Sequence, residues 1–303
     1  MPVCSGVSVA LCVGISVVRQ TKIGKIAPSD VTVILAMHIV PARLLLASTL
    51  LLGVAASLWL QSRYFSVLPD NLAFRAPVPI TERAVRIAIV GDSWAAGRKM
   101  DELVRAELGR LGWTVEVVSF GQPGARSQLI YHNLFEPRSE DNSSHDVLFG
   151  EPVHAAIVIA GVNDSSGYIG ADHYAHHTTL IAKALHQRGI LPLILELPEY
   201  GIEHATSSDP LGVVRRRLMR WVYHGDQVNV IGRYRQTLDA ELRRSFQSGG
   251  YHVIDFDPVT SDFHASAELF ADALHLSAKG RQRLAQQIGV SIEPVLASKL
   301  LTP

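Results

Sequence analysis

Short apolar runs and longer amphipathic segments alternate along the chain after its first eighty residues. The short runs are rich in branched residues and have the length of buried strands, whereas the longer segments carry apolar residues at helical spacing. The pattern predicts strands at 85–90, 114–120, 154–160, 191–197 and 252–256, and helices at 98–111, 171–188 and 277–300. Strands that alternate with helices form a parallel sheet with helices on both faces. The sequence therefore predicts an α/β fold.

A stretch of seventeen residues without a charge, LLLASTLLLGVAASLWL at 44–60, precedes this pattern and follows Arg43. Its length is at the lower limit for a helix that spans a membrane. We therefore expect residues 44–61 to form a transmembrane anchor. A cleaved signal peptide is the alternative, because Val54-Ala55-Ala56 resembles a small-residue cleavage site. The apolar run continues past that point to Leu60, which favours the anchor.

The segments on either side of this stretch complete the organisation of the chain. Within residues 1–43, the apolar residues 1–18 are either a second membrane helix or translated sequence ahead of a start at Met37. Both interpretations give one topology, because basic residues beside an apolar stretch stay in the cytoplasm. We expect residues 62–83, which contain three prolines, to be a linker. Residues 84–303 then form one domain outside the cytoplasm, in the periplasm or at the cell surface.

Charge and cysteine content narrow the chemistry. Lys and Arg together number 28, as do Asp and Glu, so no net field favours nucleic acid as a partner. The only two cysteines, Cys4 and Cys12, lie ahead of the expected anchor. The expected domain therefore has no cysteine, which excludes disulfides, thiolate catalysis and a cysteine-based zinc site there.

Polar, glycine-rich segments follow three of the expected strands, and another polar segment precedes the last helix. In open α/β sheets, reactive groups collect in the loops at the carboxyl ends of the strands. The four segments are GDSWAAG at 91–97, GQPGARS at 121–127, GVNDS at 161–165 and DALHLS at 272–277.

These segments contain the residue types that activate a hydroxyl group. Ser93 becomes a nucleophile only when a base takes its proton, and His275 is the candidate base. Asp272, three residues earlier, can orient the imidazole and stabilise its charged form. Gly91 relieves crowding in the turn that holds Ser93, and the N-terminus of the following helix favours developing negative charge. We expect Ser93, Asp272 and His275 to be catalytic.

The oxyanion of a tetrahedral intermediate also needs preorganised donors. The backbone N–H groups of Ser93 and Gly124 and the side-chain amide of Asn163 suit this role, because glycine allows close approach of the backbone. We expect Asp92 to accept hydrogen bonds from its own turn and Asp164 to support its own loop.

The four segments resemble, in the same order, conserved blocks of the SGNH (GDSL-like) hydrolases. The resemblance implies Ser93 as nucleophile, Gly124 and Asn163 as oxyanion donors, and Asp272 with His275 as the remainder of the triad. It extends from residue 86 to about residue 285 and implies a flavodoxin-like three-layer α/β/α sandwich. Trp94 replaces the leucine that is common after the GDS triplet. We expect the indole to narrow the acyl pocket or to stack on a sugar.

The resemblance implies a serine esterase that hydrolyses small acyl esters through an acyl-Ser93 intermediate. With a domain outside the cytoplasm, we expect O-acetyl groups on cell-envelope or exported polysaccharide as the substrate. One alternative is an O-acyltransferase with the same triad. Another is a non-catalytic glycan-binding assembly component, against which the complete set of catalytic and oxyanion residues argues.

Three histidines in the expected helix at 171–188 raise the question of a metal. His173, His176 and His177 lie at positions i, i+3 and i+4, close to Asp172. This spacing suits metal ligands, but solvent-exposed histidines are the more common explanation. The triad chemistry needs neither a metal nor a cofactor, so we expect neither.

Overall fold

The computed structural model describes residues 44–59, 65–69, 72, 74–77, 80, 84–96, 99–135, 148–167, 169–201, 214, 230–246, 249–256 and 264–299. The chain divides into two units, Met1–Ala56 and Ser57–Pro303. Residues 44–59 are helical, and residues 1–43 lie outside the described residues. Among the residues described, no helix combines the length and the apolar character that crossing a membrane requires. The anchor at 44–61 therefore stays a prediction.

The second unit contains one five-stranded parallel sheet. Its strands are β1 (Ala84–Gly91), β2 (Thr114–Gly121), β3 (Ala155–Ile159), β4 (Leu191–Leu195) and β5 (His252–Ile254). Their order is β2-β1-β3-β4-β5, and every neighbouring pair is parallel. This is the strand order of flavodoxin-like sheets. All five strands predicted from the apolar runs are confirmed, although β4 and β5 end two residues earlier than expected.

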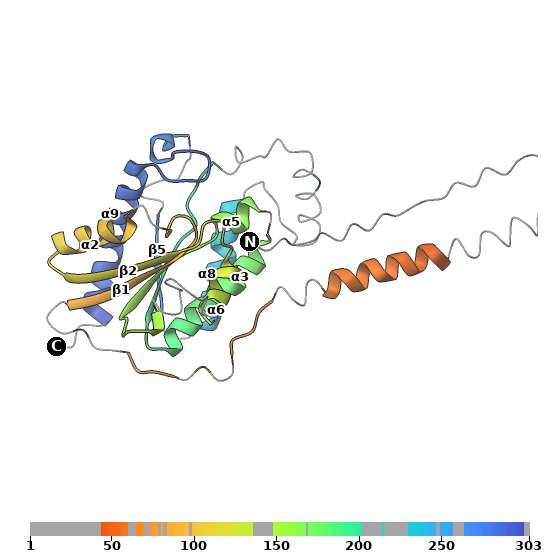
Figure 1. The fold of residues 1–303 in the computed structure, drawn as a ribbon, viewed down its shortest axis with the longest axis horizontal. Coiled ribbons are helices and arrows are strands. Elements are labelled where there is room, and N and C mark those ends of the chain that lie inside the picture. The colour runs from red at the N-terminus through yellow and green to blue at the C-terminus, as the bar shows by residue number, and fades with distance from the viewer. Residues whose placement is uncertain are drawn as a thin grey trace, which may run out of the picture. The chain divides into compact units, whose positions relative to one another are not determined.

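Helices cover both faces of the sheet (Figure 1). On one face α2 (Met100–Arg110) packs against α9 (Ala278–Lys299). On the other face α6 (Ala171–Gln187) packs against both α3 (Ser127–Asn133) and α8 (Val230–Ser245). Two short elements complete the described part, α5 (Val162–Ser166) and the 3₁₀ turn η1 (Ala267–Leu269). The three-layer α/β arrangement predicted from the alternating pattern is therefore confirmed.

The core lies between these layers and is densest around the central strands. All residues of β3 and β4 are buried, as expected for strands that are covered on both faces. Most of these residues are Ile, Leu or Val, and fully burying one such side chain contributes about 1.5–3 kcal/mol. The core therefore gives a rigid base to the loops that leave the carboxyl ends of the strands.

The crossover pattern fixes where a site can form. From β1 the chain moves to β2 on one side, then passes to β3 on the other side of β1. The carboxyl ends of β1 and β3 therefore border a topological switch point, where ligands bind in open α/β sheets.

Candidate active site

The loops after the first three strands meet at one edge of the sheet. Gly91, the last residue of β1, is in register with Gly121 of β2 and Ile159 of β3. A Cβ atom at Gly91 would lie 2.1 Å from the carbonyl oxygen of Ile159, so this position accepts only glycine. The expected relief of crowding at Gly91 is thus explained by the close approach of β3.

Ser93 lies in a tight turn directly after β1. The N–H groups of Ala95 and Ala96 donate to the carbonyl of Asp92 at 3.1 and 3.0 Å, which closes the turn around Ser93. Helix α2 begins only at Met100, seven residues beyond Ser93. The helix expected at 98–111 is therefore confirmed as α2. It does not begin at the serine, so the turn itself carries the hydroxyl.

Asp92 is fully buried beneath this turn. Its Oδ1 accepts the N–H of Trp94 at 2.9 Å, which confirms the expected hydrogen bond to turn backbone. Its Oδ2 has no hydrogen-bond partner within the described part of the chain. Burial raises the pKa of Asp92 to about 7, an effect that the Trp94 N–H reduces and nearby Asp164 increases. A carboxyl so placed holds a proton near neutral pH.

His275 and Asp272 lie together in the loop between η1 and α9. The Nδ1 atom of His275 is 2.9 Å from Oδ2 and 3.1 Å from Oδ1 of Asp272. Oδ1 also accepts the backbone N–H groups of Leu274 and His275, both at 2.8 Å. Partial burial works in the opposite direction, but these hydrogen bonds keep the pKa of Asp272 below its ordinary value. An ionised Asp272 therefore fixes the imidazole with Nε2 free to accept a proton.

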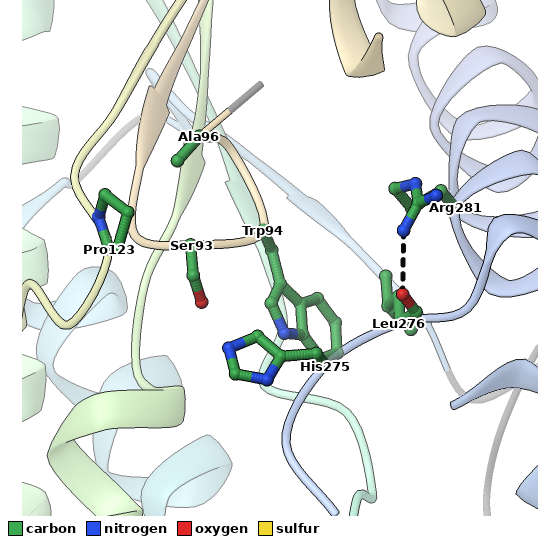
Figure 2. Close-up of a pocket in the computed structure, with 7 residues that line it drawn as sticks. All are labelled: Ser93, Trp94, Ala96, Pro123, His275, Leu276 and Arg281. Atoms are coloured by element: carbon green, nitrogen blue, oxygen red, sulfur yellow. Dashed lines mark hydrogen bonds between the residues drawn. The ribbon is translucent and has the colours of Figure 1, made fainter. Parts of the chain in front are cut away.

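Ser93 and His275 line the same cavity (Figure 2). Its volume is about 160 Å³. The lining residues are Ser93, Trp94, Ala96, Pro123, His275, Leu276 and Arg281. The fold thus brings together a hydroxyl and an imidazole that are 182 positions apart in the chain.

The two remaining expected oxyanion donors lie in adjoining loops. Gly124 has a left-handed backbone with φ of +76°, and a Cβ atom there would meet open space. Glycine is therefore favoured by conformation rather than by crowding. The side-chain amide of Asn163 donates to the carbonyl of Ala125 at 3.0 Å, which ties α5 to the loop of Gly124. This bond uses one of the two N–H groups of the Asn163 amide.

Buried Asp164 connects the loop of Asn163 to the loop that follows Gly124. Its Oδ2 accepts the N–H of Ser127 at 2.9 Å and its Oδ1 accepts the Ser127 hydroxyl at 2.7 Å. Burial raises the pKa of Asp164, and the bonds from Ser127 partly offset this effect. Asp164 therefore supports the start of α3 as well as its own loop.

Trp94 connects the loops of Ser93 and His275, a role that the sequence did not indicate. Its side chain is only 4% exposed, so it has no open ring face for a sugar. The expectation of sugar stacking is therefore wrong, whereas the indole does border the cavity. Its Nε1–H donates to the carbonyl of Leu274 at 2.8 Å, next to His275. Trp94, directly after Ser93, is thus hydrogen-bonded to Leu274, directly before His275.

The histidines of α6 are not solvent-exposed as expected. His173 and His177 are buried, and His176 is half-buried with its Nε2 2.8 Å from the carbonyl of Ser66. Burial and, to a smaller extent, neighbouring His173 lower the pKa of His177 to about 3, so this ring is neutral near pH 7. Across the described ranges, no group of histidine, cysteine or carboxylate side chains is arranged to hold a metal ion.

Comparisons with known proteins agree with this arrangement. A model of the GDSL-like lipase/acylhydrolase family matches residues 89–283. A comparison with curated protein sequences finds no significant match. Among solved structures, TesA is similar with a TM-score of 0.50 and 15% identity, covering 70% of this chain and 99% of TesA.

Two further structures have slightly lower TM-scores. The lipase/acylhydrolase from Enterococcus faecalis gives a TM-score of 0.49 at 17% identity, covering 70% of this chain and 96% of its own. A family 3 carbohydrate esterase from Clostridium thermocellum gives 0.49 at 14%, covering 72% and 99%. At these identities the likeness concerns the fold alone.

Proposed function

Because the chain belongs to the GDSL-like lipase/acylhydrolase family, we propose that it is a serine esterase with Ser93, His275 and Asp272 as its catalytic triad. One observation carries the proposal. Ser93 and His275 line one cavity, and Nδ1 of His275 lies 2.9 Å from Oδ2 of Asp272. Nucleophile, base and orienting carboxylate are thus available in the order that the chemistry requires.

The reaction proceeds in two halves through a covalent intermediate. Ser93 Oγ attacks the ester carbonyl while its proton passes to Nε2 of His275, and Asp272 stabilises the resulting imidazolium. His275 then gives this proton to the alkoxide of the leaving alcohol, which leaves an acyl-Ser93 ester. A water molecule, activated by the same imidazole, attacks the acyl carbon and releases the carboxylic acid, and the proton returns to Ser93.

The negative charge that develops on the carbonyl oxygen is stabilised by fixed donors. We assign this role to the N–H groups of Ser93 and Gly124 and to the amide of Asn163. The bond from Asn163 to Ala125 supports the assignment, because it holds the amide beside the loop that carries Gly124. Donors positioned before the reaction need no reorganisation during it.

The substrate we propose is a small acyl ester, with O-acetyl groups on cell-envelope or exported polysaccharide as the natural target. The small cavity, about 160 Å³ and bordered by the buried indole of Trp94, is in keeping with a short acyl group. We further propose that the domain is anchored to a membrane and lies outside the cytoplasm. The apolar helix at 44–59 supports this, since Leu44, Leu51 and Trp59 are exposed there.

Hydrolysis of p-nitrophenyl acetate, butyrate and octanoate by the full chain tests the proposal. We expect the acetate to be cleaved fastest, and acetate to be released from acetylated polysaccharide. Ser93→Ala is the control and should be inactive towards all of them. A full chain that cleaves none of these esters, or a Ser93→Ala variant as active as the wild type, contradicts the proposal.

A further inference from the structure

Arg281 introduces a positive charge into a cavity that is otherwise neutral. It stands in the first turns of α9 and lines the same cavity as Ser93 and His275. The other lining residues are Trp94, Ala96, Pro123 and Leu276. None of these four carries a charge that offsets a guanidinium group.

The guanidinium of Arg281 is held in place but is not neutralised. Its Nη1 donates to the carbonyl of Leu276 at 2.8 Å, as the dashed line in Figure 2 marks. Across the described residues no carboxylate lies within ion-pair distance of it, whereas Lys279 on the same helix pairs with Glu268. A guanidinium has five N–H donors, so several remain for a ligand. A half-buried arginine without a counter-charge is suited to bind an oxyanion.

The position of Arg281 indicates which part of the substrate would carry that oxyanion. In the proposed reaction His275 protonates the leaving alkoxide, so the alcohol part of the ester departs on the imidazole side. Arg281 is bonded to Leu276, which directly follows His275 in the chain. The guanidinium therefore belongs to the side of the leaving alcohol, across Ser93 from Pro123 (Figure 2).

We propose that Arg281 forms an oxyanion-binding subsite for the alcohol part of the ester, so that the substrates are acyl esters of anionic alcohols. Sugars that carry a carboxylate or a phosphate group have this chemistry. The inference rests on the proposed esterase function and narrows its substrate class. The alternative is that Arg281 is only structural, and that its hydrogen bond to Leu276 holds the loop of His275 without any contact to the substrate.

A pair of acetyl esters that differ in one charge separates these two possibilities. We choose 4-acetoxybenzoate, whose leaving alcohol is an anion, and its neutral methyl ester. The quantity measured is the ratio of kcat/KM for the anion to kcat/KM for the neutral ester, within each variant of the full chain. This ratio cancels any general loss of activity, because both esters transfer the same acetyl group to Ser93.

For the wild type we expect the ratio to exceed one, with a lower KM for the anion. Arg281→Gln should lower the ratio about tenfold, the scale of one charge-assisted hydrogen bond in a partly open site. Arg283→Gln is the matched control, because it removes the same charge two residues away, where the side chain is exposed and binds Gln286. It should change the ratio less than about twofold.

The outcomes distinguish the two proposals. A wild-type chain that hydrolyses both esters without a preference for the anion, or an Arg281→Gln variant with an unchanged ratio, overturns the subsite and leaves the esterase standing. A wild-type chain that hydrolyses neither ester overturns both. A 3-acetoxybenzoate preferred over the 4-isomer would support the subsite and place the anion closer to the ester.

Discussion

The indole Nε1–H of Trp94 donates to the carbonyl of Leu274 at 2.8 Å, across 180 positions of the chain. Trp94 follows the serine and Leu274 precedes the histidine, so one hydrogen bond connects the two loops that must act together. The ring also makes an edge contact with Phe256 and a tilted contact with Phe270, and it is only 4% exposed. Trp94 therefore positions His275 relative to Ser93.

Replacing Trp94 with Phe keeps an aromatic ring and removes this donor. We expect kcat to fall about tenfold, because a small displacement of a catalytic group is costly, with KM less affected. The free energy of unfolding should decrease by about 1–2 kcal/mol, since the Leu274 carbonyl loses its partner. Steady-state kinetics and urea unfolding measure both effects. The control is Trp113→Phe, a buried tryptophan directly before the amino end of β2 and therefore at the other edge of the sheet. A larger loss of kcat in that variant would refute the positioning role of Trp94.

Replacing Asn163 with Ala removes one proposed oxyanion donor. We expect kcat to fall about a hundredfold, the scale for one such donor, with little change in KM. Asn163→Asp should be at least as damaging, because it keeps the size of the side chain but puts acceptor oxygens in place of the donor. If only KM changed, Asn163 would bind the ground state and would not stabilise the oxyanion.

The raised pKa of Asp92 predicts how stability depends on pH. In the folded protein its pKa is about 7, whereas an unfolded chain has the ordinary value of 3.8. The folded state therefore keeps a proton that the unfolded chain has released. The contribution of Asp92 to stability is complete below about pH 4 and is lost as the pH rises through about 7.

The variant Asp92→Asn should remove this loss, because a neutral amide can still accept the N–H of Trp94. We expect the unfolding free energy of the variant, relative to wild type, to increase by roughly 3 kcal/mol between pH 4 and pH 7. Urea unfolding at several pH values provides the measurement, with the exposed Asp172→Asn as control. A difference that stays constant with pH would mean that Asp92 is ionised throughout.

Replacing His275 with Ala should cost more activity than replacing Asp272 with Asn. The alanine variant loses the base, and its kcat/KM should fall thousands-fold or more. The asparagine variant keeps an Oδ1 atom that accepts the N–H groups of Leu274 and His275, so the loop is retained. Its loss should be smaller by at least about tenfold. Glu268→Gln serves as the control for a carboxylate in the same region, and the reverse order of the two losses would contradict the assigned roles.

The alternation of apolar runs was sufficient to predict the sheet, because buried strands and amphipathic helices differ in period and length. It also placed the loops of Ser93, Gly124 and Asn163 after neighbouring strands, since parallel strands end at one edge of a sheet, whereas the roles of these three residues stay predictions. The helix predicted at 98–111 is found as α2 at Met100–Arg110, but the tight turn that separates it from Ser93 was not predicted. Local pattern does not show how a chain connects a strand to the next helix.

Long-range contacts explain what the sequence did not indicate. The bond from Trp94 to Leu274 and the burial of Asp92 depend on how loops fold over one another, and no periodicity along the chain records this. His173 and His177 were expected in solvent because exposed histidines are a more common explanation of such spacing than a metal site. Their i, i+4 spacing places them on one face of α6, and that face packs inward. No carboxylate pairs with Arg281 among the described residues, and this too depends on the folding of the chain and not on a local pattern.

The central claim, that Ser93 is the nucleophile and His275 activates it, is tested most directly by covalent labelling. The full chain is treated with diisopropyl fluorophosphate, and the labelled residue and the rate of labelling are determined by mass spectrometry. We predict one diisopropylphosphoryl group on Ser93, none at this position in Ser93→Ala, and labelling of His275→Ala that is slower by a thousandfold or more, as expected for loss of the base. A label on a different residue of the wild type, or labelling of His275→Ala at the wild-type rate, would contradict the account.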